Sequence, residues 1–180
     1  MNLANKLTVI RIILVPIFLI FMTLQSRTCF VIGSLIFIIA SITDKLDGYI
    51  ARKRNEVTNF GKFMDPLADK LLVTSALVIL VEFGVIRAWV VMVIIAREFA
   101  VSGLRTLAAS EGVVIAASKW GKSKTVVQII AIILGLISLI YSHRYLILLT
   151  NIFIILAVVI TIISGIDYFV KNKDIIKTNK

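Results

Sequence analysis

Six apolar runs, separated by short polar breaks, constrain the possible folds of this chain more than any other feature. The runs cover residues 7–24, 29–51, 66–81, 88–108, 126–140 and 145–170. With their polar ends included, they approach the roughly 17–25 residues that a helix needs to cross a bilayer. Hydrophobic residues make up 59% of the chain, compared with about 45–50% in soluble domains. The sequence therefore predicts an all-α, polytopic membrane protein with six transmembrane helices, forming a single domain over residues 1–180.

Most lysines and arginines lie in the breaks on one side of the predicted bundle. The opposite breaks hold Arg27, Arg87 and Arg144 as their basic residues. Because basic loops stay in the cytoplasm, we expect both termini and the stretch 44–69 to face the cytoplasm. The net charge of +10 fits contact with anionic lipid. The basic residues are not interleaved with aromatic ones, so nucleic-acid binding is not expected.

Four aspartates lie in one stretch at the polar ends of the second and third runs, namely Asp44, Asp47, Asp65 and Asp69. Each pair falls on one face of its helix, so two adjacent helices can bring four carboxylates together. Carboxylates are costly against lipid, which predicts a polar cavity open to the cytoplasm. An all-oxygen ligand set suits Mg²⁺ or Mn²⁺. The guanidinium group of Arg52 can donate two parallel hydrogen bonds to phosphate oxygens. The pattern favours metal-assisted phosphate chemistry, with solvated helix ends and ordinary ion pairs as the alternative.

The same stretch follows the spacing D-x₂-D-G-x₂-A-R-x₈-G-x₃-D-x₃-D. Its positions are filled by Asp44, Asp47, Gly48, Ala51, Arg52, Gly61, Asp65 and Asp69. This pattern resembles the signature of the CDP-alcohol phosphotransferase family. The resemblance implies a six-helix membrane enzyme, usually a homodimer, that moves a phosphatidyl group from CDP-diacylglycerol to an alcohol and releases CMP.

The resemblance also implies roles for individual residues. Two Mg²⁺ or Mn²⁺ ions per active site would be held by Asp44, Asp47, Asp65 and Asp69, and Asp69 would also be the general base. The residues implied in CDP-diacylglycerol binding are Asn5, Thr8, Thr43, Asp44, Asp47, Gly48, Ala51, Arg52, Thr58 and Gly61. Asn5 has an alternative interpretation as a cap of the first helix.

A second group of charged residues follows in the fourth and fifth runs. Arg97, Glu98 and Arg105 fall within one helical face, and a lysine-rich segment follows on the same side of the membrane. These cations suit an acceptor that carries phosphate, and segments 97–105 and 118–125 resemble those of family members that use glycerol 3-phosphate. The predicted acceptor-phosphate residues are Lys62, Arg97, Arg105, Ser118, Lys119, Lys122 and Lys124.

Three other functions remain open from the sequence. A family member could use another acceptor, such as inositol phosphate or phosphatidylglycerol. A divalent-cation transporter would instead distribute its acids through the depth of the bilayer, and a membrane-anchored nucleic-acid binder has the net charge alone in its favour. With the family resemblance, the expected partners are CDP-diacylglycerol, glycerol 3-phosphate, membrane lipids and a second copy of the chain. The expected location is a bacterial cytoplasmic membrane.

Overall fold

The structure, a computed structural model, describes residues 3–53, 59–110, 112–113, 115–116 and 118–173. Within these ranges, the side chains of residues 3–4, 44–53, 59–60 and 62–63 are not described. The regular structure of the described residues is entirely helical, which confirms the predicted all-α class. Its helices are α1 (Leu3–Thr23), α2 (Arg27–Lys53), α3 (Asn59–Glu82), α4 (Ala88–Ser110), α5 (Lys119–Ile140) and α6 (Arg144–Lys171).

Two helices begin well before the apolar runs that predicted them. Helix α3 begins at Asn59 rather than near residue 66, and α5 begins at Lys119 rather than near residue 126. The polar ends are therefore part of these helices. At the start of α5, the Ser118 hydroxyl accepts a hydrogen bond from the Gly121 backbone N–H at 3.0 Å. This N-cap satisfies one of the backbone donors left open at the helix start.

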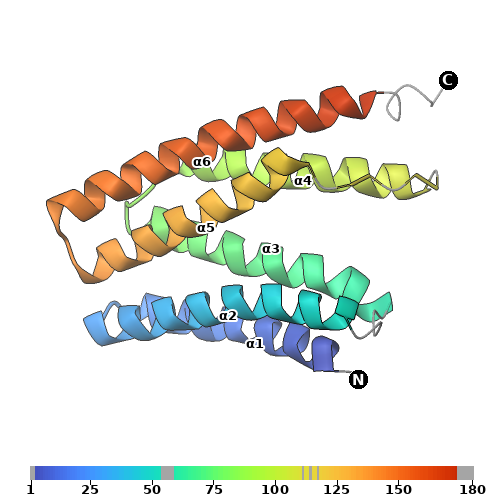
Figure 1. Cartoon of the computed structure of the whole chain (residues 1–180). Coiled ribbons are helices and arrows are strands. Elements are labelled where there is room, and N and C mark those ends of the chain that lie inside the picture. The colour runs from blue at the N-terminus through green and yellow to red at the C-terminus, as the bar shows by residue number, and fades with distance from the viewer. Residues whose placement is uncertain (1–2, 54–58, 111, 114, 117, 174–180) are drawn as a thin grey trace.

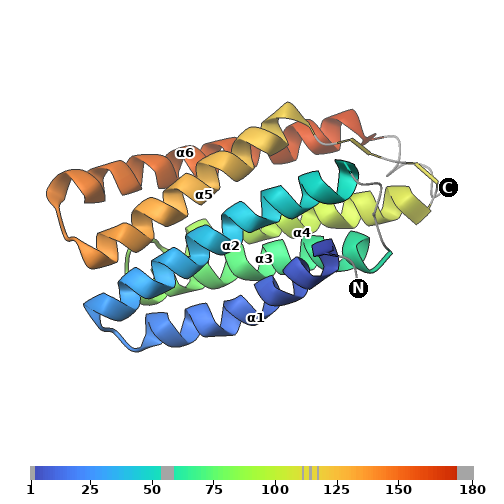
Figure 2. The same cartoon turned by 60° about the horizontal axis from the view of Figure 1, so that its bottom comes forward.

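The helices form two packed groups, α1–α3 and α4–α6 (Figure 1). Within the groups, α1 packs against α2 and α3, while α6 packs against α4 and α5. Contacts of α5 with α2 and α3, and of α4 with α3, join the two groups. Both views show the two termini at the same end of the bundle, the end at which Figure 1 shows the groups spread apart (Figures 1 and 2).

An apolar core holds the two groups together. The ring centroids of Phe18 in α1 and Phe37 in α2 lie 6.1 Å apart, and neither side chain is exposed. Helix α5 approaches α3 at Gly135, where an added Cβ would lie 2.8 Å from a methyl carbon of Leu80. Such close contact between large side chains and glycine fixes the distance between helices.

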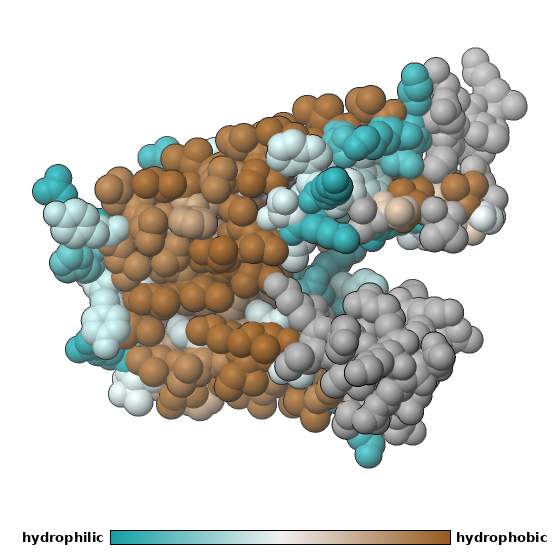
Figure 3. Space-filling model, viewed as in Figure 1, coloured by the Kyte–Doolittle hydropathy of each residue, from teal (hydrophilic) through white to brown (hydrophobic). Residues whose placement is uncertain are grey.

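The outward faces of the helices are also apolar, as the space-filling view shows (Figure 3). Large hydrophobic side chains are exposed along the bundle, for example Ile39 (58%), Met92 (63%) and Ile155 (64%). By length and composition, three of the described helical segments could cross a membrane: Asn5–Thr23, Lys119–Ile140 and Arg144–Lys171. An apolar exterior over such helices is that of an integral membrane protein. The number of six crossings stays a prediction.

Candidate active site

Two of the four predicted carboxylates have described side chains, and both lie near the start of α3. Asp65 and Asp69 are one turn apart and half-buried. The Thr8 hydroxyl of α1, which is fully buried, donates a hydrogen bond of 2.5 Å to Asp65 Oδ1. This contact fixes the Asp65 carboxylate against α1, while Asp69 faces a cavity.

The cavity has a volume of about 650 Å³ and lies between α3, α4, α5 and α6. Figure 3 shows hydrophilic side chains at the edge of the hollow between the two helix groups. Asp69 lines this cavity together with other polar and charged residues. These residues are Lys70, Thr74, Arg97, Glu98, Ser102, Arg105, Thr106, Ser118, Lys122, Lys124, Thr125, Gln128 and Tyr168.

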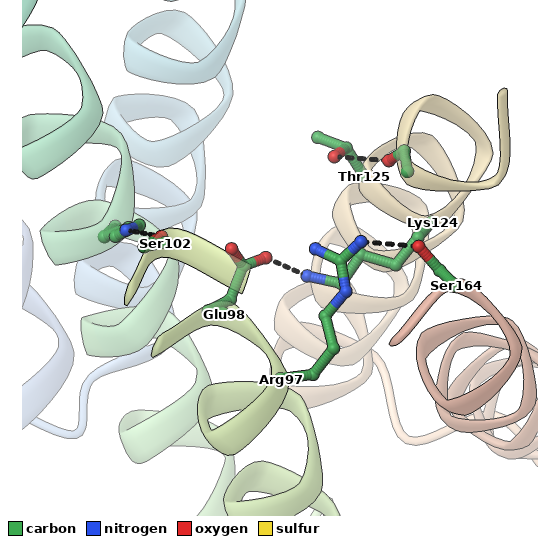
Figure 4. Close-up of polar contacts among 8 residues, drawn as sticks. Arg97, Glu98, Ser102, Lys124, Thr125 and Ser164 are labelled. Atoms are coloured by element: carbon green, nitrogen blue, oxygen red, sulfur yellow. Dashed lines mark hydrogen bonds and ion pairs between the residues drawn. The ribbon is translucent and has the colours of Figure 1, made fainter. Parts of the chain in front are cut away.

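A partly buried ion pair crosses the cavity between α4 and α5. The Lys124 ammonium contacts the Glu98 carboxylate (Figure 4). The Lys124 side chain is 1% exposed, whereas that of Glu98 is 31% exposed. Asp69 interacts electrostatically with both residues, and also with Arg11 of α1 and the neighbouring Lys70. The carboxylates are therefore surrounded by cations from three helices.

The two arginines of α4 are held by the last helix. Arg97 donates to the Ser164 hydroxyl through Nη2 at 2.5 Å (Figure 4). Arg105 donates to the Tyr168 hydroxyl through Nε at 2.6 Å. Both arginines line the cavity, so the structure brings together two of the predicted acceptor-phosphate residues.

The structure places the predicted acceptor residues in different environments. Ser118, Lys122 and Lys124 line the cavity with the two arginines, and Ser118 also caps α5. Lys119 is exposed at the first residue of α5 and is not among the described residues that line the cavity. Lys62 belongs to α3, but its side chain lies outside the described part of the structure.

Most of the predicted donor site also lies outside the described side chains. This applies to Asp44, Asp47, Gly48, Ala51, Arg52 and Thr58. Asn5, Thr8 and Gly61 are described and buried, consistent with positions inside the bundle. The Thr43 hydroxyl donates to the Ile39 carbonyl of its own helix at 2.6 Å. Among the described residues, no group of three or more His, Cys, Asp or Glu side chains could hold a metal.

Several polar residues of this site were not identified from the sequence, among them four that form side-chain hydrogen bonds. Lys70 and Ser102 form a hydrogen bond between α3 and α4, and Ser164 and Tyr168 contact the arginines. The spacing of Ser164 and Tyr168, one helical turn apart within an apolar run, is a signal that could have indicated a buried polar face. Lys70 follows Asp69 directly in the sequence.

This arrangement is suited to moving an anionic group. A carboxylate that can accept a proton lies in the same cavity as several fixed cations, and those cations can hold phosphate oxygens. The apolar exterior places the cavity within reach of a lipid substrate. The site can thus join a phosphate-bearing small molecule to a membrane-embedded partner.

Comparison with known proteins agrees with this chemistry. The chain is 47% identical to the CDP-diacylglycerol–glycerol-3-phosphate 3-phosphatidyltransferase of Bacillus subtilis (strain 168), with 99% of this chain and 98% of that protein covered. A protein of the same name from Rickettsia bellii is 43% identical, with 93% of this chain and 93% of that protein covered. Another from Haemophilus influenzae is 41% identical, with 93% of this chain and 91% of that protein covered. Residues 1–163 match the CDP-alcohol phosphatidyltransferase family, and the chain therefore belongs to that family.

Proposed function

We propose that this protein transfers the phosphatidyl group of CDP-diacylglycerol to sn-glycerol 3-phosphate, forming phosphatidylglycerophosphate and CMP. The observation that carries this proposal is the cavity in which Asp69 lies together with Arg97, Arg105 and Lys122. The names of relatives that are 41–47% identical over nearly the whole chain support the same donor and acceptor.

A divalent metal requirement is general in this family, and two of the described residues are ligands of the kind that such a cofactor prefers. Asp65 and Asp69 offer hard oxygen ligands one turn apart on α3, and Thr8 already orients the Asp65 carboxylate. Asp44 and Asp47 of α2 would complete the ligand set for two Mg²⁺ or Mn²⁺ ions. When bound, a metal pair neutralises charge on the attacked phosphorus and on the leaving nucleotide.

The residues of the chain perform the remaining steps. Asp69 accepts the proton of the acceptor hydroxyl as the oxygen attacks the phosphorus that carries the diacylglycerol. The new phosphorus–oxygen bond forms while the bond to the CMP phosphate breaks, and CMP leaves with the electron pair of that bond. The donor is bound by a separate set of residues, namely Asn5, Thr8, Thr43, Gly48, Ala51, Arg52, Thr58 and Gly61. An alcohol is a weak nucleophile until its proton is removed, so a base at Asp69 accelerates the transfer.

The acceptor phosphate binds to the cationic part of the cavity. A dianion loses much of its hydration there, which is unfavourable unless charged donors replace the water. Arg105 and Lys122 provide such donors. Arg97, Lys62, Ser118, Lys119 and Lys124 contribute to the positive potential or to the hydrogen bonds of the same region.

The proposal includes the orientation and assembly of the protein. Both termini and the active site face the cytoplasm of a bacterial cell, because the basic breaks of the sequence lie on that side. The protein works as a homodimer in the cytoplasmic membrane. Proteolysis of a tag at either end, in sealed inverted and right-side-out vesicles, distinguishes the two orientations.

The activity is tested with the purified protein in detergent, CDP-diacylglycerol and Mg²⁺. The protein is incubated separately with glycerol 3-phosphate, glycerol, inositol phosphate and phosphatidylglycerol, and the lipid product is identified by mass spectrometry. We expect phosphatidylglycerophosphate and CMP with glycerol 3-phosphate, and loss of product after chelation. A lipid product formed from another acceptor, with none from glycerol 3-phosphate, would contradict the proposal.

A further inference from the structure

Helix α6 contributes two buried hydroxyl groups to the arginines of the cavity. Ser164 is not exposed and Tyr168 is 3% exposed. They lie one turn apart on α6 and contact Arg97 and Arg105 of α4, respectively. Helix α6 therefore determines how both arginine side chains are presented.

The two contacts use different parts of the guanidinium group. Ser164 occupies Nη2 of Arg97, and Nε of Arg97 is buried without a hydrogen-bond partner among the described residues. Tyr168 instead occupies Nε of Arg105, which is the donor nearest the aliphatic stem. The contact with Tyr168 does not use the two terminal amino groups of Arg105. Together these groups can donate to two oxygens of one phosphate.

Tyr168 packs against α4 and against residues that precede α5. Its ring packs with Val101 and Leu104 of α4, with Ile115 against the same cluster. Its hydroxyl lies 3.5 Å from the Ala116 carbonyl, at the outer limit of a hydrogen bond. Because the ring is buried in this cluster, the hydroxyl is held in place as an acceptor for the Arg105 side chain.

We propose that Tyr168 is a positioning residue for the acceptor phosphate. Its hydroxyl holds Arg105 Nε so that the terminal amino groups are oriented for phosphate before the acceptor binds. This inference rests on the proposed function, since it requires an acceptor that carries phosphate. A preoriented arginine loses less side-chain freedom on binding, so the benefit appears in acceptor affinity and not in the donor site or the rate of transfer.

The direct test is Tyr168→Phe, which removes the hydroxyl and keeps the ring. We expect the KM for glycerol 3-phosphate to rise by about threefold to tenfold, the range of one lost hydrogen bond. The kcat and the KM for CDP-diacylglycerol should change by less than about twofold on the same scale. Tyr145→Phe is the matched control, because Tyr145 is 75% exposed and lies near the start of α6, at the opposite end from Tyr168.

A double-mutant cycle separates positioning from packing. If Tyr168 acts through Arg105, then Tyr168→Phe should raise the acceptor KM no further in an Arg105→Ala background. Arg105→Lys provides a second test that leaves Tyr168 intact. The lysine keeps the positive charge but lacks both the Nε–H donor and the paired terminal amino groups of the guanidinium. We expect its acceptor KM to rise at least as much as that of Tyr168→Phe.

The possible results have distinct meanings. A wild-type acceptor KM in Tyr168→Phe or in Arg105→Lys would overturn the inference. It would also be overturned if Tyr168→Phe raised the acceptor KM by the same factor in the wild-type and the Arg105→Ala backgrounds. An equal loss of kcat and of affinity for both substrates, with a lowered melting temperature, would assign Tyr168 to packing and also overturn it. If the wild-type protein makes no lipid product from glycerol 3-phosphate, the proposed function itself fails.

Discussion

The buried hydroxyl of Thr8 donates a 2.5 Å hydrogen bond to the carboxylate of Asp65, across the contact between α1 and α3. The family resemblance implies that Thr8 contacts the donor lipid, and this geometry predicts that it also orients Asp65, a predicted metal ligand. A hydrogen bond to a ligating carboxylate fixes its direction and strengthens metal binding.

Thr8→Val should therefore raise the Mg²⁺ concentration needed for half-maximal activity by about tenfold. The metal-induced rise in melting temperature should need a similarly higher concentration. Thr8→Ser retains the hydroxyl and serves as the control. If the KM for CDP-diacylglycerol rises instead, at an unchanged metal requirement, Thr8 belongs to the donor site as the sequence suggested.

Asp69→Asn should reduce turnover by about 10²- to 10⁴-fold, the range of general base catalysis. The amide has nearly the same shape but cannot accept the proton of the acceptor hydroxyl. Steady-state assays give the rate, and binding of CDP, measured by calorimetry, is expected to fall far less. Retention of most of the activity would place the base at another residue.

Helix number and order could be predicted from the sequence because long apolar runs separated by short polar breaks leave few alternatives. The spacing of the aspartates also predicted that Asp65 and Asp69 share a face of one helix, as they do. The starts of α3 and α5 were less predictable. Their first turns are polar, and hydropathy alone does not distinguish a polar helix end from a loop.

Contacts between distant helices were beyond the reach of sequence periodicity. A helical period tells which residues share a face, but not which other helix that face meets. The contacts of Arg97 with Ser164 and of Arg105 with Tyr168 join residues more than sixty positions apart. For the same reason, Lys124 was predicted as a phosphate ligand, while its ion pair with Glu98 became evident only in the structure.

The Glu98–Lys124 pair predicts an asymmetric effect on stability. Glu98→Gln leaves the charge of Lys124 in a site that is 1% exposed, with Asp69 as a remaining interaction partner of opposite charge. Breaking a fully buried ion pair costs about 3–5 kcal/mol, and the loss here should fall below that range because this pair is only partly buried. Lys124→Gln should cost less, because Glu98 is 31% exposed and retains water. Unfolding in detergent by chemical denaturant compares these variants with the double variant, which should recover part of the loss. Equal destabilisation by the two single variants would contradict this account.

Lys122 and Lys119 provide a final comparison within the lysine-rich start of α5. Both were predicted to bind the acceptor phosphate, and both side chains are exposed. Lys122 lines the cavity, whereas Lys119, at the first residue of the helix, is not among the described residues that line it. A direct charge-assisted hydrogen bond to the phosphate contributes about 1.5–3 kcal/mol. A lysine outside the cavity acts on the phosphate only at a distance, and salt screens such an interaction within about 10 Å. Lys122→Ala should thus raise the KM for glycerol 3-phosphate by roughly tenfold to hundredfold. Lys119→Ala should have a smaller effect that disappears at high ionic strength. Steady-state kinetics with each substrate varied, at low and high salt, measures both effects, and a larger or salt-independent effect of Lys119→Ala would place the acceptor phosphate outside the cavity.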